Sequence, residues 1–92
     1  MAKIFVVEYE SQADVKAFKA TYDSQADILV FVEKYESQSS VDERWFYVEY
    51  ESQASTKLFW VDYESQATLK VHFVEYESQA KWQKSHARRG RL

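Results

Sequence analysis

Tyr50-Glu51-Ser52-Gln53-Ala54 is the stretch that decides the fold, because its first four residues return in almost the same form throughout the chain. The six copies occupy residues 9–12, 22–25, 35–38, 50–53, 63–66 and 76–79, and only the acidic residue varies, being Asp23 in the second copy. Successive tyrosines are 13, 13, 15, 13 and 13 residues apart. A fixed spacing is the signature of repeat architecture, so the sequence predicts six pseudo-repeats.

The segments between the copies are rich in Val, Phe, Trp and Ile, which favour strands. Four residues before each tyrosine stand Phe5, Phe18, Phe31, Phe46, Phe59 and His72, and five residues before it stand Ile4, Ala17, Val30, Trp45, Leu58 and Val71. These two sets lie on opposite faces of an extended strand, and both are mostly apolar. We therefore expect strands that are covered on both faces. A helix would align Val15, Phe18 and Tyr22, but the crowding of aromatic and β-branched residues at 44–48 favours β-structure.

The odd repeat length requires a break in the pleat, since strict alternation over 13 residues would place Tyr9 and Tyr22 on opposite faces. We expect this break at Glu-Ser-Gln-Ala, as a bulge or a corner in which Ser and acidic side chains bond the nearby backbone. Tight hairpins are not expected, because the only glycine is Gly90 and there is no proline. The chain should bend at each corner and continue rather than reverse.

Two extra residues near Ser39-Ser40-Val41-Asp42 divide the chain into three repeats followed by three more. This division suggests a chain that goes round twice, with the second circuit pairing with the first. The predicted fold is therefore all-β, double-wound and closed into a toroidal or barrel-like sheet. Closure hides strand edges, so we expect a monomer.

Length and composition suit one repeat domain over residues 1–82, followed by a basic tail over 83–92 that we expect to be flexible. The absence of cysteine is compatible with a reducing compartment, and no apolar run exceeds Ile28–Val32, so we expect a cytoplasmic protein that does not enter membranes. Charge is divided unevenly. Residues 1–80 hold all 15 acidic and seven of the 12 basic residues and carry −8, whereas residues 81–92 carry +5.

The repeated strand segments that end in Tyr-(Glu/Asp)-Ser-Gln-Ala resemble the Septknot family over about residues 3–80. That resemblance implies a small all-β protein whose chain winds twice around a torus and forms a deep seven-crossing knot. Ser39 in place of Ala, the two-residue insertion and His72 depart from the pattern. The resemblance implies an uncharacterised role and transfers no catalytic or binding residues.

The corner residues suggest several sites, each with a plainer structural interpretation. The corner acids could hold Ca²⁺ or Mg²⁺, or could simply keep the surface soluble. They stand at positions 10, 23, 36, 51, 64 and 77, and Glu8, Glu49, Asp62 and Glu75 add to their negative charge. The Ser and Gln sets could form a central ladder or a small-ligand pocket. Buried tyrosines would make Tyr63→Ala cost on the order of several kcal/mol.

Catalysis is not expected. His72 lies in a strand and His86 in the tail, and the chain has no cysteine and no Gly-rich phosphate loop. We predict no catalytic residues, no cofactor and no metal, and a small structural or interaction module. The alternative function is RNA or DNA binding through tail residues Lys81, Lys84, Arg88, Arg89 and Arg91, with Trp82 as a stacking partner, and the second alternative is cation binding by the corner acids.

Overall fold

Seven short strands and six single-turn 3₁₀ helices make up the computed structural model, which describes residues 2–92. The strands are β1 (Lys3–Val6), β2 (Val15–Lys19), β3 (Ile28–Val32), β4 (Arg44–Tyr47), β5 (Thr56–Trp60), β6 (Leu69–Phe73) and β7 (Lys81–Trp82). The 3₁₀ helices are η1 (Glu10–Gln12), η2 (Asp23–Gln25), η3 (Glu36–Gln38), η4 (Glu51–Gln53), η5 (Glu64–Gln66) and η6 (Glu77–Gln79). The predicted all-β fold of six repeats is confirmed.

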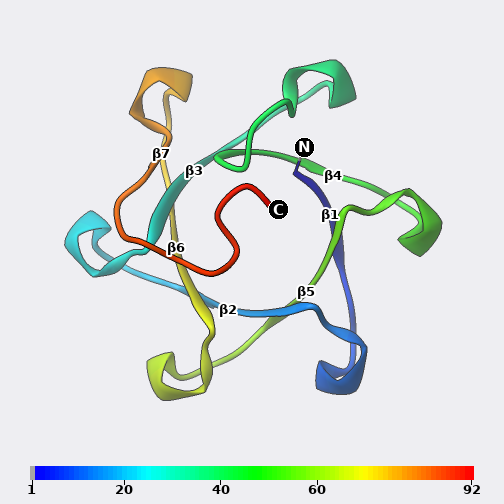
Figure 1. Cartoon of the computed structure of the whole chain (residues 1–92), viewed down its shortest axis with the longest axis horizontal. Helices are drawn as coiled ribbons and strands as arrows, with labels where there is room; N and C mark the ends of the chain where they lie inside the picture. Colours follow the sequence, from blue (N-terminus) through cyan, green and yellow to red (C-terminus); the bar gives the residue numbers. More distant parts are fainter. Residues whose placement is uncertain (1) are drawn as a thin grey trace.

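Six parallel strands close into a barrel in the order β4-β1-β5-β2-β6-β3, and a β3–β4 pairing completes the circle. The short β7 pairs antiparallel with β3. Strands β1, β2 and β3 lay down the first circuit, and β4, β5 and β6 fill the spaces between them on the second, so the predicted double winding is confirmed. Figure 1 shows the ring down its shortest axis, with the six corners projecting outward.

Neighbouring strands are offset by two residues in the same sense at every step around the barrel. Tyr47 of β4 lies opposite Ile4 of β1, and Ile4 in turn lies opposite Thr56 of β5. Such a stagger tilts the strands and keeps equivalent residues of the six repeats at the same height. The barrel interior is therefore stacked in layers, one side chain per repeat.

The middle layer of the core is formed by the residues five before each tyrosine, and all six are fully buried: Ile4, Ala17, Val30, Trp45, Leu58 and Val71. β4 lies across the ring from β2, so the large Trp45 faces the smallest member, Ala17. The Trp45 ring lies 6.4 Å from Trp60 and 5.8 Å from Phe73, on the two strands that flank β2. Trp45 thus spans the barrel into the space that Ala17 leaves.

The corners break the pleat as 3₁₀ turns, and each is closed by backbone bonds rather than by side-chain caps. In η1, for example, the Gln12 N–H donates to the Tyr9 carbonyl and the Ala13 N–H donates to the Glu10 carbonyl, both at 3.1 Å. The hydrogen bonds expected from the corner Ser and acidic side chains to nearby backbone are not found within residues 2–92, and no side-chain cap is seen at the six helix starts. Within residues 2–92 only Gly90 has a positive φ, in agreement with the expected absence of tight hairpins.

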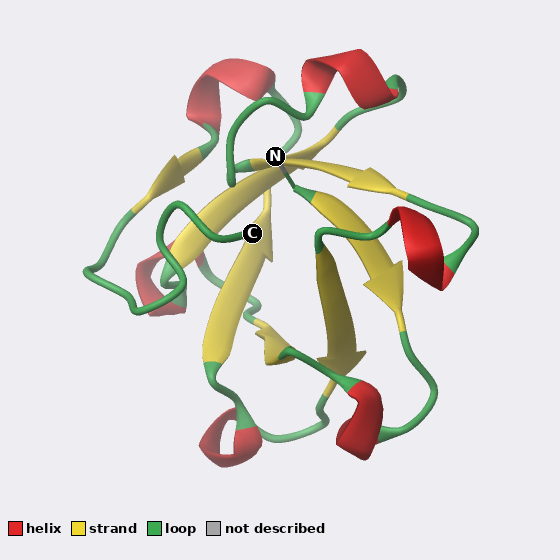
Figure 2. Ribbon diagram, turned by 45° about the vertical axis from the view of Figure 1, so that its right-hand side comes forward, coloured by secondary structure: helices red, strands yellow, loops and turns green. Residues whose placement is uncertain are grey.

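The prediction of buried tyrosines is wrong. All six corner tyrosines are 63–68% exposed, and the corner Ser and Gln side chains are exposed as well, so there is no central ladder. Figure 2 shows the 3₁₀ corners projecting away from the strands of the barrel. The outer barrel face is only partly covered, since the five phenylalanines and His72 that stand four residues before the corner tyrosines are half-buried rather than enclosed.

Candidate functional site at the two ends of the barrel

The two ends of the barrel differ in what closes them. At the amino ends of the strands, residues 83–92 cross the opening, and the chain stops near the ring centre (Figure 1). The Leu92 side chain is 1% exposed and joins the core cluster, while its carbonyl accepts a hydrogen bond from Thr56 Oγ1 at 2.9 Å. The structure thus packs a segment for which the sequence suggested a flexible tail.

Asp42 holds this segment in place. Its buried carboxylate accepts hydrogen bonds from Trp82 Nε1 (3.1 Å), from the Leu92 N–H (3.1 Å) and from the Gly90 N–H. Asp42 belongs to the β3–β4 connection, which lies in the one repeat that is 15 rather than 13 residues long. The insertion therefore supplies the anchor for the last ten residues.

The basic residues of the tail lie on the surface of this cap. Lys81, Lys84, Arg89 and Arg91 are exposed, and Arg88 is half-buried with its guanidinium donating to the Asp14 carbonyl at 2.8 Å. Trp82, which would have to stack on a base, is already stacked on His86 at 5.6 Å and bonded to Asp42. Nothing in this arrangement favours the nucleic-acid alternative.

A set of short polar residues, whose role was not foreseen from the sequence, joins four of the six corners to a neighbouring strand. Asp14 Oδ2 accepts from the Lys57 N–H (3.0 Å), Asp27 Oδ2 from the Lys70 N–H (2.9 Å), and Ser55 Oγ from the Lys3 N–H (2.8 Å). Each stands two residues after the corner Gln. The sequence does show a polar residue recurring two positions after the corner Gln. Its role could not be predicted, because it depends on which strands are neighbours in the barrel.

The carboxyl ends of the strands form an open mouth lined by aromatic rings. Lys19, Tyr47, Trp60, Val61 and Phe73 surround a hollow of about 360 Å³. Trp45 lies beneath them, fully buried, and its ring is 6.4 Å from that of Tyr47 and 5.8 Å from that of Phe73. Tyr47 is 38% exposed, and its partial burial raises the pKa of its phenol above its ordinary value.

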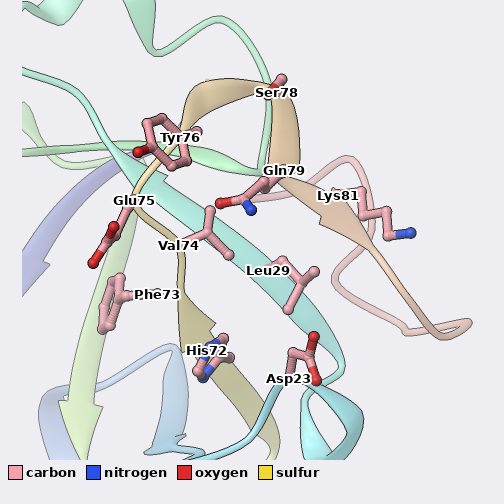
Figure 3. Close-up of a pocket in the computed structure, with 10 residues that line it drawn as sticks. All are labelled: Asp23, Leu29, His72, Phe73, Val74, Glu75, Tyr76, Ser78, Gln79 and Lys81. Carbon is pink, nitrogen blue, oxygen red and sulfur yellow. The ribbon is translucent and has the colours of Figure 1, made fainter.

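Acidic residues follow these aromatic residues just beyond the ends of their strands. Two positions beyond Tyr47, Trp60 and Phe73 stand Glu49, Asp62 and Glu75, all exposed. Figure 3 shows Phe73 and Glu75 on the same side of their chain. The first and third repeats place Glu8 and Lys34 at the equivalent position, so acids predominate around the mouth.

The corner acids do not converge. Glu10, Glu51 and Glu64 pair with the lysines six residues later, at 3.1–3.3 Å, while Glu36 pairs with Lys3 and Glu77 with Arg44. Within residues 2–92 no three His, Asp or Glu side chains gather as they would around a metal ion. The arrangement gives no support to the cation-binding alternative.

An open depression of about 650 Å³ beside β3 is lined by His72, Asp23 and Ser78. Figure 3 shows Asp23 close to His72 and Ser78 at the opposite end. β3 carries Leu29 at the position where the other strands of the barrel carry Lys or Arg, so Asp23 lacks the lysine found at other corners. His72 Nδ1 lies 3.0 Å from the Ala20 carbonyl and must donate to it. No hydrogen bond in the described part of the chain joins His72 to Asp23 or Ser78, so these residues do not form a nucleophile–base pair.

Glu33 is a buried carboxylate on the outer face of the barrel wall. One of its oxygens has no hydrogen-bond partner, and the Arg44 guanidinium lies 3.8 Å away and bonds Glu77 more closely, at 2.7 Å. Burial, and secondarily Glu77, raises the pKa of Glu33, with Arg44 acting in the opposite direction.

Residues 1–83 match the family of the 7(1) septoil knot domain. The chain belongs to the septoil knot family. The match covers all six parallel strands and β7, and the alternation of first-circuit and second-circuit strands around the barrel is the path that such a knotted, double-wound chain takes. No curated protein and no solved structure matches this chain.

Family membership accounts for the architecture of this knotted barrel and assigns no activity to it. No positive sign of catalysis accompanies the match. None of the helices in residues 2–92 has the length and apolar character needed to cross a bilayer.

Proposed function

We propose that this septoil knot protein is a small, non-catalytic interaction module that presents its six corners as equivalent contact points. The observation that carries the proposal is that the exposed corner residues vary less among the six repeats than the buried core residues do, whereas buried positions are usually the less variable ones. Exposed Tyr, Ser and Gln are identical in all six corners, whereas the buried middle layer varies from Ala17 to Trp45.

The fold itself does not explain the identity of the corner side chains. Each corner is closed by backbone hydrogen bonds, and the side chains of the corner Tyr, Ser and Gln make no hydrogen bond within residues 2–92. Surface positions without contacts normally tolerate substitution with little change in stability. A requirement outside the folded chain is therefore the simplest reason for keeping the same three residues six times.

The chemistry of the corners suits recognition of another protein. Tyr offers a large amphipathic contact at low entropic cost, and Ser and Gln offer adaptable hydrogen bonds, as in antibody loops. Six such contacts on one rigid ring, about 32 Å across, allow weak individual contacts to act together. We further propose that the module acts as a cytoplasmic monomer, since barrel closure leaves no long strand edge for self-association.

The test is to relate binding to the number of intact corners. A photo-crosslinker replacing Tyr63 identifies contacts at a corner, and the same group replacing Phe59, on the half-buried barrel wall, is the matched control. Affinity for the captured partner is then measured with tyrosines replaced by Ala at one, three and all six corners. Affinity should fall steeply with each loss. Equal binding by the six-corner variant, or unfolding of that variant, would contradict the proposal.

A further inference from the structure

The mouth at the carboxyl end of the barrel is separate from the corners and unused by the proposed function. We propose that it is a binding site for a small quaternary ammonium compound, such as a trimethylammonium alcohol. The site consists of the aromatic rings of Tyr47, Trp60 and Phe73. The buried Trp45 ring lies within 6.4 Å of all three. The exposed acids Glu49, Asp62 and Glu75, each two residues after one of these rings in the sequence, supply the acidic rim that we propose.

The aromatic part of the site is built from three strands that barrel closure brings together. The Trp60 and Phe73 ring centres are 5.8 Å apart with a 58° angle between planes, so their faces form an angled wall. Tyr47 comes from β4, across the ring from the gap between them. Trp, Tyr and Phe faces carry negative charge density, and several rings around one hollow are the arrangement that recognises methylated ammonium groups.

The protein already places a cation against this wall. Lys19 Nζ lies 5.6 Å from the centre of the Phe73 ring, within the range of a cation–π contact. Lys19 is exposed and its chain is flexible, so its ammonium can leave for water when a ligand arrives. The contact shows that the aromatic wall accepts positive charge, and it makes Lys19 a competitor of the ligand.

The acidic charge at the rim and the hydration of the ligand's cation together favour one class of ligand. The acids attract a cation and disfavour an anion. An ammonium such as that of Lys19 stays at the exposed edge, because full entry into the apolar hollow would remove its water shell. A quaternary ammonium carries its charge under methyl groups and is weakly hydrated. It therefore satisfies both the aromatic wall and the acidic rim.

The proposal is tested on the whole chain by comparing the binding of choline with that of its neutral isostere 3,3-dimethylbutanol. The two compounds have the same shape and differ in charge. The three tryptophans give the readout, since the indole N–H signals of Trp45 and Trp60 report on the mouth and that of Trp82 on the capped end. Choline should shift the first two signals and leave the third in place, and it should bind roughly tenfold more tightly than the isostere.

Charge variants separate the site from general electrostatics. Glu49→Gln should weaken choline binding severalfold, whereas Glu51→Gln, the same change at a corner acid paired with Lys57, should leave it unchanged. Lys19→Met should strengthen binding severalfold, because it removes the competing cation and keeps the aliphatic chain. None of these variants alters the buried core, so loss of folding does not confuse the result.

Three results would overturn the proposal. They are equal affinity for choline and its isostere, shifts confined to Trp82, and no shift at roughly 100 mM choline, where even a very weak site would be occupied. Binding to phosphatidylcholine vesicles without binding to free choline would indicate a lipid surface instead, and would also refute a small-molecule site.

Discussion

Glu33 stands at a position where the other repeats carry Val7, Ala20, Val48, Val61 and Val74. It is 6% exposed, and its pKa is raised mainly by burial. A carboxyl with a raised pKa in the folded state holds a proton that the unfolded chain has released. Stability from this group is therefore greatest at low pH and is lost as pH rises from about 4.5 through the raised pKa.

Glu33→Gln should increase the free energy of unfolding at pH 7, because the amide needs no proton to remain neutral in the buried site. It should also remove the decline in stability that begins above about pH 4.5. Urea titrations at a series of pH values measure both effects. Glu64→Gln, at an exposed acid paired with Lys70, is the control and should keep the decline. A parallel pH profile for wild type and Glu33→Gln would contradict the prediction.

Tyr63→Ala should change the free energy of unfolding by no more than about 0.5 kcal/mol, the usual range for an exposed side chain. The Tyr63 ring is 68% exposed, the most of the six corner tyrosines. Leu58→Ala, which empties a fully buried position five residues away, should cost about 2–5 kcal/mol in the same urea titration. A loss near the Leu58 value at Tyr63 would mean that the corner packs on the barrel in solution.

At the scale of elements, the six side chains of the middle core layer fill the barrel interior because the large Trp45 of β4 faces the small Ala17 of β2 across the ring. Ala17→Leu should lower the free energy of unfolding by about 1–3 kcal/mol, since Trp45 already fills the space beside Ala17. Combining Ala17→Leu with Trp45→Leu should cost less than the sum of the two single changes. Strict additivity in the double-mutant cycle would show that the two positions do not share the space.

The cap over the amino end depends on one carboxylate. Asp42→Ala should cost about 2–4 kcal/mol, because it leaves the buried N–H of Leu92 and the partly buried N–H of Trp82 without their acceptor. Hydrogen exchange at residues 84–92 should accelerate more than exchange in β1. Asp62→Ala, at an exposed acid, is the control for the charge change. Unchanged exchange in the tail would mean that Asp42 is not its anchor.

The sequence was informative about the strands and much less so about what surrounds them. The repeat spacing, the alternation of Phe5 with Ile4 and the lack of glycine before Gly90 were enough to predict strands, corners and double winding. The exposure of Tyr63 was missed because alternation assigns a residue to a face but does not show whether anything covers that face. The Asp42 anchor and the aromatic mouth were missed because both depend on which strands become neighbours across the ring.

At the scale of the whole molecule, the knot should oppose mechanical unfolding. A chain of this family cannot be drawn through a narrow pore without tightening its crossings, whereas an unknotted domain unravels. When it carries a degradation tag, the protein should therefore be degraded by an unfoldase–protease more slowly than an unknotted domain of equal unfolding free energy. The degradation rates of the two proteins under the same conditions measure this, and equal rates would remove the proposed mechanical advantage.

The alternation of first-circuit and second-circuit strands also divides the chain into two halves that depend on each other for every strand pairing. Every strand pairing joins one of β1, β2 and β3 to one of β4, β5, β6 and β7, and none lies within either half. Residues 1–39 and 40–92 made as separate peptides would each lack any strand partner. Each should stay unfolded alone, and together they should form a split-protein pair. All three tryptophans lie in 40–92, so a change in tryptophan fluorescence as Trp45 becomes buried would report that both fragments have met.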